Sequence, residues 1–331
     1  MTRIRVVIAT PALAQANNGN WQTARRWQAL LAQRHRARIV SGWPDEQALA
    51  DPSLDQVLLA LHARRSAPSV AAWARQHGGH GLGVVLTGTD LYRDIATDAD
   101  AQRSLQLAQQ LVVLQERAPD ALPPEFRGKA RVIFQSTRSR KTLPKTRQHL
   151  RVVAVGHLRE EKDPLTLMQA AELLREDRGI RIDHLGDALD TALGEAARRT
   201  EAGGAPYRWL GARPHADALR RIQRAHLLVH MSLLEGGAHV VMESVCSGTP
   251  VIASRIAGNI GMLGEDYAGY FPPGDAPALA ALLRQCRDQW IAAQGDDLMS
   301  QLGRQCAARA ALFSPQREQA ALEQLVTDLA S

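Results

Sequence analysis

The feature that most constrains the fold is an alternation of short β-branched runs with Ala-, Leu-, Arg- and Gln-rich stretches, and it occurs twice. This alternation is typical of parallel sheets built from βαβ units. In the first half it predicts strands at 3–10, 37–40, 56–61, 82–87, 111–115 and 131–135. A basic, polar stretch at 137–148 then predicts a linker. After it, the alternation restarts with strands at 151–155, 181–185, 207–210, 227–231 and 251–254.

Because the alternation restarts after the linker, we expect two α/β domains. The 331 residues also exceed the usual size of a single hydrophobic core. We expect an N-terminal Rossmann-like domain at 1–140 and a C-terminal one at 150–310. A last helix at 311–331, redirected by Pro315, can pack back on the first domain. Ligands bind beyond the carboxyl ends of parallel strands, so two such sheets facing each other predict one cleft between the domains.

Composition narrows the function classes. The net charge of +6 and pI near 9.6 invite a nucleic-acid interpretation. However, the arginines are scattered and aromatic residues make up only 4% of the chain, too few for base-stacking platforms. We therefore expect phosphate-bearing small molecules and no nucleic acid. No apolar run approaches the length that crosses a bilayer, and three cysteines without metal or redox spacing favour a reducing cytoplasm.

The most informative stretch is 228–254, LVHMSLLEGGAHVVMESVCSGTPVIAS. An apolar strand leads to Glu235 and a Gly-rich turn, and the helix that follows carries Glu243. Glycines allow close backbone approach, the amides at a helix start attract phosphates, and carboxylates accept hydrogen bonds from sugar hydroxyls. The alternative is an ordinary strand–helix crossover with an exposed glutamate.

Glu235 and Glu243 are separated by seven residues and are followed by Ser-Gly-Thr-Pro-Val-Ile-Ala-Ser. This segment resembles the E-x7-E motif of the GT4 family of GT-B glycosyltransferases. The likeness continues through 257–259 and the Pro-Pro-Gly-Asp loop at 270–275. It implies a GT-B fold, with Glu235 binding the donor sugar and Glu243 its ribose. The donor site would also include Gly236, Gly237 and Ala238.

Upstream, residues 156–163 resemble the G-R-L-x-x-x-K loop with which that family grips the donor diphosphate. Lys162 occupies the lysine position, which suits stabilisation of an anionic leaving group. The family's arginine is His157 in this chain, and Arg159 could replace it. The alternative for Lys162 is a solvated charge before a helix.

Two segments of the first half, 61–66 and 86–94, each follow an apolar strand. With the motifs above they resemble the selenosugar synthases of selenoneine biosynthesis, a divergent GT4 branch. Those enzymes join a sugar from UDP-N-acetylglucosamine or UDP-glucose to selenophosphate, releasing UDP and phosphate. Candidate acceptor-binding residues are Arg64, Arg65, Thr87, Gly88, Thr89 and Asp90. The alternatives are a solvated helix start and a strand-to-helix cap.

The resulting hypothesis is sugar transfer from UDP to selenium. Its candidate catalytic residues are His62 as acid–base group, Lys162 and Glu235, with no metal or other cofactor. His62 could equally be a hydrogen-bonded structural histidine. Enzymes that make selenophosphate or use the selenosugar are candidate partners. Two alternatives remain: a conventional GT4 transferase with a sugar or lipid-linked acceptor, and a non-catalytic basic nucleotide- or RNA-binding protein.

Overall fold

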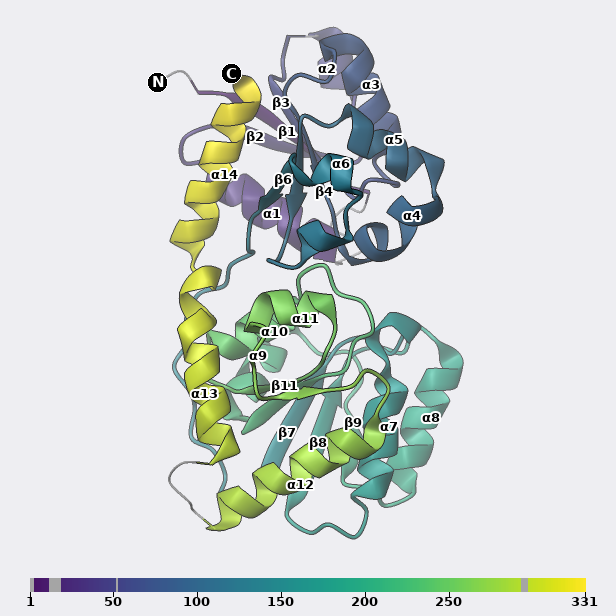
Figure 1. The fold of residues 1–331 in the computed structure, drawn as a ribbon, viewed down its shortest axis with the longest axis vertical. Helices are drawn as coiled ribbons and strands as arrows, with labels where there is room; N and C mark the ends of the chain where they lie inside the picture. Colours follow the sequence, from purple (N-terminus) through teal and green to yellow (C-terminus); the bar gives the residue numbers. More distant parts are fainter. Residues whose placement is uncertain (1–2, 12–18, 52, 293–296) are drawn as a thin grey trace. The chain divides into compact units, whose positions relative to one another are not determined.

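A computed structural model describes residues 3–11, 19–51, 53–292 and 297–331. The chain divides into two compact units, each with a six-stranded sheet (Figure 1). Unit 1 comprises residues 1–136 and 315–331, and unit 2 comprises residues 137–314. All paired strands in both sheets are parallel.

The sheet of unit 1 has the order β2-β1-β3-β4-β5-β6. Its strands are β1 (Arg5–Ala9), β2 (Arg36–Val40), β3 (Val57–Leu61), β4 (Leu82–Val85), β5 (Gln110–Val113) and β6 (Ala130–Val132). Side chains alternate along each strand, so Val7 joins one hydrophobic core and Val6 the other. The sheet is therefore covered on both faces, as its near-continuous apolar strands require.

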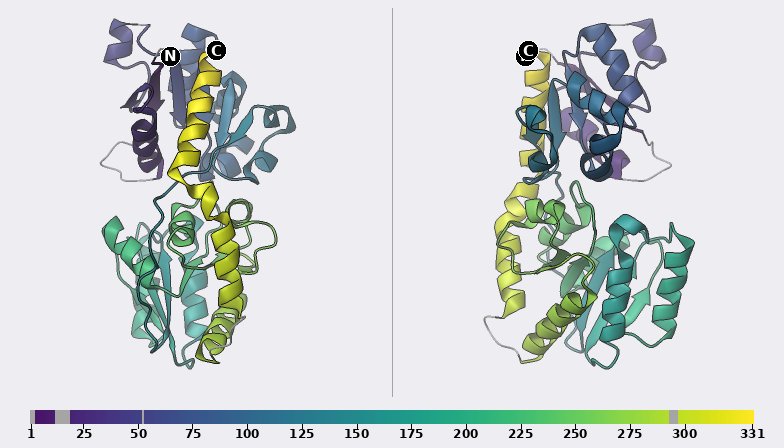
Figure 2. Two further views of the ribbon diagram at one scale, coloured as in Figure 1. Left: turned by 90° about the vertical axis from the view of Figure 1, so that its left-hand side faces the viewer. Right: turned by 45° about the vertical axis from the view of Figure 1, so that its right-hand side comes forward.

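The helices of unit 1 fall into two groups. They are α1 (Gly19–Leu31), α2 (Glu46–Ala50), α3 (Ala67–His77), α4 (Ile95–Thr97), α5 (Ala99–Leu107), α6 (Pro124–Arg127) and α14 (Pro315–Ala330). Trp73 of α3 and Leu105 of α5 lie in one core, whereas Trp27 of α1 and Leu322 of α14 lie in the other. The last helix thus packs beside the first one on the sheet of unit 1 (Figures 1 and 2).

A buried glutamate fixes α14 in this position. The carboxylate of Glu318 accepts hydrogen bonds from Trp27 Nε1 at 2.7 Å, from Arg26 Nε at 3.0 Å and from the backbone amide of Ser136 at 2.9 Å. Because a buried carboxylate needs such partners, these bonds specify the position of the helix against α1.

Unit 2 has the sheet order β12-β11-β10-β7-β8-β9. Its strands are β7 (Leu150–Val155), β8 (Ile180–Leu185), β9 (Tyr207–Trp209), β10 (Leu227–His230), β11 (Val251–Ser254) and β12 (Tyr270–Phe271). Its helices are α7 (Pro164–Leu173), α8 (Thr191–Ala202), α9 (His215–Arg224), α10 (His239–Val245), α11 (Ala257–Leu263), α12 (Ala276–Ala292) and α13 (Leu298–Arg309). Helix α7 packs against α8 and α12, whereas α9 packs against α10.

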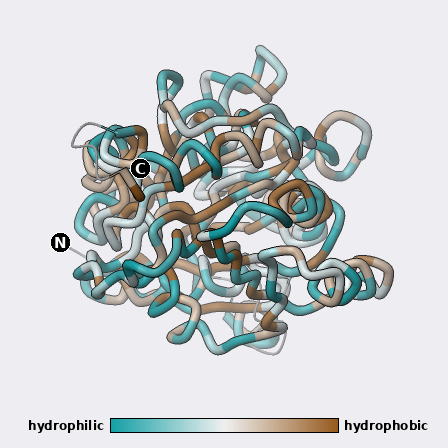
Figure 3. Tube along the Cα trace, turned by 90° about the horizontal axis from the view of Figure 1, so that it is seen from below, coloured by the Kyte–Doolittle hydropathy of each residue, from teal (hydrophilic) through white to brown (hydrophobic). Residues whose placement is uncertain are grey.

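Every strand that the sequence predicts is present, but several end earlier than expected. In the run 82–87, β4 ends at Val85; the Leu86 amide still donates to Val112 O of β5, and the Thr87 amide then donates to Asp90 instead. Strand β12 was not predicted, since two residues carry too little pattern. Along the coloured trace, hydrophobic and hydrophilic segments alternate, as expected of elements with one covered face (Figure 3).

The predicted linker is an extended strap that belongs to unit 2. Residues 137–146 form no helix or strand. The amide of Arg140 donates to Cys246 O at 2.9 Å, and that of Leu143 donates to Gln223 O at 3.1 Å. These bonds attach the strap to α9 and α10. In the described part of the chain, no helix is long and apolar enough to cross a membrane.

Candidate functional site

The sheet of unit 2 contains a topological switch point. Read from β9, its order is the 3-2-1-4-5-6 order of the doubly wound fold, and it reverses between β7 and β10. The loop after β7 therefore lies beside the loop after β10, and the amide of Leu233 donates to Glu161 O at 2.9 Å. Ligands of such sheets bind in the crevice at this point. The two loops are those that the sequence singled out.

Lys162 and Glu235 meet at this switch point. The Lys162 ammonium forms an ion pair with Glu235, and His230 Nε2 at the end of β10 lies 3.2 Å from the same carboxylate oxygen. Burial by itself would raise the pKa of Glu235, but Lys162 and His230 hold this pKa well below its usual value. Glu235 is thus an ionised, buried carboxylate that can accept hydrogen bonds.

The loop after β7 is shaped by its own sequence. It ends at Asp163, whose backbone takes a left-handed conformation with φ 45° and whose carboxylate caps α7 at Thr166 N, 3.4 Å away. Pro164 occupies the first helical position, where no amide hydrogen is needed. This cap places the single helical turn with Lys162 next to the start of α7.

Glu243 lies on α10 and has a partner that the sequence reasoning missed. Its Oε1 is 2.6 Å from Nε2 of His215, the first residue of α9. The hydrogen bond from His215 to this carboxylate raises the pKa of the histidine. Glu243 is buried, whereas the side chain of His215 is 70% exposed. The second carboxylate is therefore oriented by a residue that solvent or a ligand can reach.

Buried polar atoms near Glu235 lack a hydrogen-bond partner. Besides His230 Nε2, which has only its ion-pair contact with Glu235, they include Ser232 Oγ, in the loop after β10, and Asn259 Oδ1, on α11. The same segment approaches Glu235 closely: a Cβ at Gly258 would come within 2.2 Å of Glu235 O, so only glycine fits. Buried polar groups are normally satisfied. Unmet groups beside an ionised carboxylate are consistent with a pocket that takes a polar ligand.

The other expected donor residues are placed differently. Gly236, Gly237 and Ala238 lead from Glu235 into α10, with Ala238 as its N-cap. Arg159 is exposed, and its Nε lies 3.9 Å from Glu161. His157 Nδ1 accepts a hydrogen bond from the Asp187 amide at 3.1 Å. The structure thus brings Lys162 and Glu235 together. It shows no contact of Arg159 with Glu235 or Glu243.

Unit 1 brings the loops after β3 and β4 together around Asp90. This fully buried carboxylate accepts hydrogen bonds from the Ala63 amide at 2.8 Å, from the Thr87 amide at 2.6 Å and from Thr87 Oγ1 at 2.7 Å. With its oxygens occupied by these bonds, Asp90 holds the two loops in register. These bonds give Asp90 a role in positioning the loops, and its contact with the acceptor stays a prediction.

His62 and Arg64 complete this cluster. His62 is buried with φ 75°; its Nε2 lies 3.3 Å from Thr89 Oγ1 and 3.9 Å from Asp94. Burial lowers the pKa of His62. Arg64 Nε lies 2.9 Å from Asp94, and Arg65 is exposed. The cluster unites the predicted residues, adds Asp94, and leaves the two guanidinium groups at the surface.

His215, His230 and Asp94 were not selected from the sequence. His215 and Asp94 contact predicted residues that are far away in the chain, which a motif read along one segment does not reveal, whereas His230 lies in the stretch 228–254 itself, five residues before Glu235. Only the rule that strand ends meet at one edge of a sheet would have flagged His230, at the end of β10. Among the described residues, no three His, Cys, Asp or Glu side chains are grouped so that they could hold a metal ion.

Comparison with known proteins agrees with this geometry. Residues 135–295 match the sequence profile of the family described as "Glycosyl transferases group 1". The matched residues make up most of unit 2 and contain both glutamates, Lys162 and the switch point, so unit 2 is similar to this family. This match supports the predicted likeness to GT4 enzymes at the level of the family.

Two curated relatives share this domain. The D-inositol 3-phosphate glycosyltransferase of Corynebacterium efficiens is 34% identical over 141 residues, 40% of this chain and 33% of that protein. The amylovoran biosynthesis glycosyltransferase AmsK of Erwinia amylovora is 27% identical over 149 residues, 41% of this chain and 35% of that protein. The chain thus matches about a third of the length of each.

The likeness in fold extends over both units. The Anabaena protein Alr3699/HepE, solved in complex with UDP, superimposes with a TM-score of 0.70 at 15% identity, covering 99% of this chain and 100% of that one. At this identity the likeness shows the fold, which is GT-B with two Rossmann-like domains. The predicted fold class is confirmed.

Proposed function

We propose that this protein is a glycosyltransferase that moves a sugar from a UDP-sugar to selenophosphate. The observation that carries the donor half is the partly buried Lys162–Glu235 ion pair at the switch point of unit 2, in the region that matches glycosyl transferases group 1. A neighbour in fold was solved with UDP, which supports a UDP-linked donor. The matches to the two curated relatives cover only about a third of each relative, so they do not identify the acceptor. The acceptor proposal depends on residues of unit 1.

The ion pair is suited to exchange partners when a donor binds. Glu235 has unused acceptor capacity, and sugar hydroxyls can fill it. Lys162 would then face the diphosphate and stabilise the charge that develops as the glycosidic bond breaks, together with the start of α10 and, if it moves, Arg159. Glu243, oriented by His215, would accept hydrogen bonds from the ribose.

The acceptor proposal rests on the two exposed arginines beside the loop after β4. Arg64 and Arg65 offer guanidinium forks, and Thr87, Gly88 and Thr89 offer hydroxyls and amides, which together suit a compact tetrahedral anion. Selenophosphate carries its own nucleophilic selenium, so a strong base is dispensable. His62, whose burial lowers its pKa, would be neutral near pH 7 and able to accept a proton.

The overall reaction balances with one water. The C1–O bond to UDP breaks and a C1–Se bond forms, and hydrolysis of the Se–P bond then gives the 1-selenosugar, UDP and phosphate. We propose that no metal takes part. The three buried, unpaired cysteines support a reducing, cytoplasmic setting, with the enzymes that supply selenophosphate or consume the product as candidate partners.

The experiment is an assay of UDP release from UDP-N-acetylglucosamine and from UDP-glucose. The acceptors are selenophosphate, inorganic phosphate as its matched control and a panel of hydroxyl compounds, and mass spectrometry identifies the product. We expect turnover with selenophosphate and a product heavier than the sugar by one selenium in place of oxygen. Turnover with a hydroxyl acceptor alone would instead establish a conventional transferase, which the names of the two relatives favour.

A further inference from the structure

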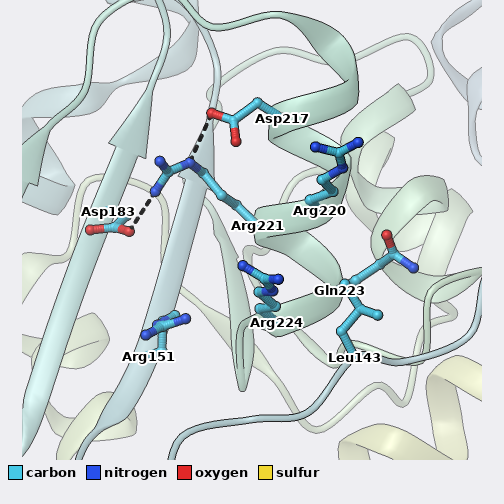
Figure 4. A pocket seen from close by; sticks show the side chains of 8 residues that line it. All are labelled: Leu143, Arg151, Asp183, Asp217, Arg220, Arg221, Gln223 and Arg224. Atoms are coloured by element: carbon cyan, nitrogen blue, oxygen red, sulfur yellow. Dashed lines mark hydrogen bonds and ion pairs between the residues drawn. The ribbon is translucent and has the colours of Figure 1, made fainter.

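Unit 2 contains a second concave site, away from the switch point. A cavity of about 530 Å³ lies between β7, β8, helix α9 and the strap. Its lining consists of Leu143, Arg151, Asp183, Asp217, Arg220, Arg221, Gln223 and Arg224 (Figure 4). Arg151 is the second residue of β7, whereas the candidate donor loop follows the far end of that strand. At ~3.3 Å per residue the two lie roughly 16 Å apart.

The cavity carries excess positive charge after its ion pairs are counted. Both aspartates are engaged by one arginine: Arg221 Nη1 lies 3.2 Å from Asp183 and Arg221 Nε lies 3.0 Å from Asp217. Asp183 also accepts from Arg208 at 2.8 Å. Within the described chain, the lining guanidinium groups of Arg151, Arg220 and Arg224 have no acidic partner.

The three arginines without an acidic partner come from two elements that line the same cavity. Arg220 and Arg224 are four residues apart on α9, so they share a face of the helix, where like charges repel. Arg151 comes from β7 of the sheet (Figure 4). The surroundings are also basic: Lys145, His149 and Arg151 all lower the pKa of His226, after the larger effect of its burial. A multiply charged anion bound in the cavity would offset this repulsion.

We propose that this cavity, the arginine pocket, binds a compact anion with two or more phosphate groups. Planar guanidinium forks match phosphate oxygens in pairs, which favours arginine over lysine for this task. The cavity is of the size that takes a small molecule. Its lining has no aromatic side chain on which a base could stack, which separates this ligand class from single-stranded RNA.

The test is calorimetric titration of the full chain with inorganic pyrophosphate and tripolyphosphate at fixed ionic strength. Arg220→Ala/Arg224→Ala should weaken binding at least 10-fold. Arg199→Ala removes an exposed arginine of α8 outside the pocket, and Lys162→Ala removes the cation of the candidate donor site; neither should change this affinity. Arg224→Lys should give an intermediate loss because it keeps the charge but not the fork. Circular dichroism checks that each variant is folded, and Arg220→Gln replaces any that is not.

Three outcomes would overturn the proposal. An equal loss in Arg199→Ala would mean diffuse attraction to a basic surface. A loss confined to Lys162→Ala would mean that the anions bind at the candidate donor site. An RNA hairpin that binds more tightly than tripolyphosphate, and loses affinity in the double variant, would make the pocket part of a nucleic-acid surface. A bisphosphorylated sugar titrated alongside distinguishes organic from inorganic ligands of this class.

Discussion

The two units have the same kind of sheet, but their buried carboxylates have different kinds of bonding partner. In unit 2 the carboxylates are bonded to side chains: Glu235 to Lys162 and His230, and Glu243 to His215. In unit 1, Asp90 is tied to backbone amides of the loops that it joins. A carboxylate bonded to flexible side chains can be exchanged for a substrate, whereas one bonded to the backbone specifies the shape of a loop.

Glu318 of unit 1 sharpens this contrast. Like Glu235 it is a buried glutamate beside a cation, but its partners also include an indole and a backbone amide that cannot leave without unpacking α14. Burial and an ion pair therefore do not by themselves mark a functional group. The identity of the remaining partners, and their freedom to move, separates the two cases.

The largest expected effect concerns Lys162 and Glu235. Lys162→Ala should reduce kcat/KM for sugar transfer by about 1000-fold, because it removes the cation opposite the leaving diphosphate. It also leaves the buried Glu235 carboxylate beside His230 but without its ammonium partner, which should lower the free energy of unfolding by about 3 kcal/mol. Steady-state kinetics and urea titration measure the two effects.

The double variant Lys162→Ala/Glu235→Gln is the matched control. Replacing the charge by an amide should restore most of the stability and none of the activity. If activity returned together with stability, the ion pair would be structural, and the contrast between Glu235 and Glu318 would be lost.

Glu318→Ala should show the opposite pattern. It breaks the bonds to Arg26, Trp27 and Ser136 and should destabilise unit 1 by about 2–3 kcal/mol. Because all four residues belong to unit 1, affinity for UDP should stay within about twofold of the wild type, far below the tenfold step that 1.4 kcal/mol represents. Hydrogen exchange of α14 amides and UDP titration measure these quantities. A loss of UDP affinity equal to that of Lys162→Ala would contradict a purely structural role.

The sequence predicted the fold and part of the site, for different physical reasons. Strands such as β3 and β11 are short apolar runs bounded by turn residues, and that pattern is local. The motifs at two strand ends placed Lys162 and Glu235 in one donor site, but the ion pair between them was not predicted. The pairing of Glu243 with His215 depends on how α9 packs against α10, which no local pattern encodes. The arginine pocket could not be predicted from the sequence either, because arginines that are scattered along the chain line one cavity only after folding.

The strap at 137–148 shows that a hydrophobicity pattern does not predict every contact of a segment. Its lack of apolar residues predicted a linker, yet it bonds to α9 and α10 through main-chain atoms. Composition reports which side chains can be buried, but main-chain amides of any residue can donate. A polar segment can thus lie against a domain without a hydrophobic signal.

A smaller effect is expected at the arginines of unit 1. Arg64→Ala should raise KM for selenophosphate about 10-fold and change KM for the UDP-sugar less than twofold, as expected for one charge-assisted contact. Arg65→Ala serves as the neighbouring comparison, because Arg65 has no ion pair to Asp94 among the described contacts and should be less well oriented. Equal increases for donor and acceptor would remove the assignment of the acceptor to this cluster.

The smallest effect is a pH dependence from His215. Its pKa is raised in the folded state by the bond to Glu243, so the pair stabilises the protein fully below the unfolded value near 6.5. That contribution is lost as pH rises through the folded pKa. Because the imidazole is largely exposed, we expect only a few tenths of a kcal/mol, measured by urea titration between pH 5.5 and 8.

His215→Gln should flatten this part of the pH profile and weaken UDP binding more at pH 6 than at pH 8, since only the charged imidazole differs strongly from an amide. The matched variant is His157→Gln, which alters an exposed histidine of the same unit that contacts a backbone amide instead of a carboxylate. If both variants changed the profile alike, general surface charge would explain it. A change confined to His215 would show that the second carboxylate of unit 2, unlike Asp90 of unit 1, is held by a partner whose grip weakens when it loses its proton.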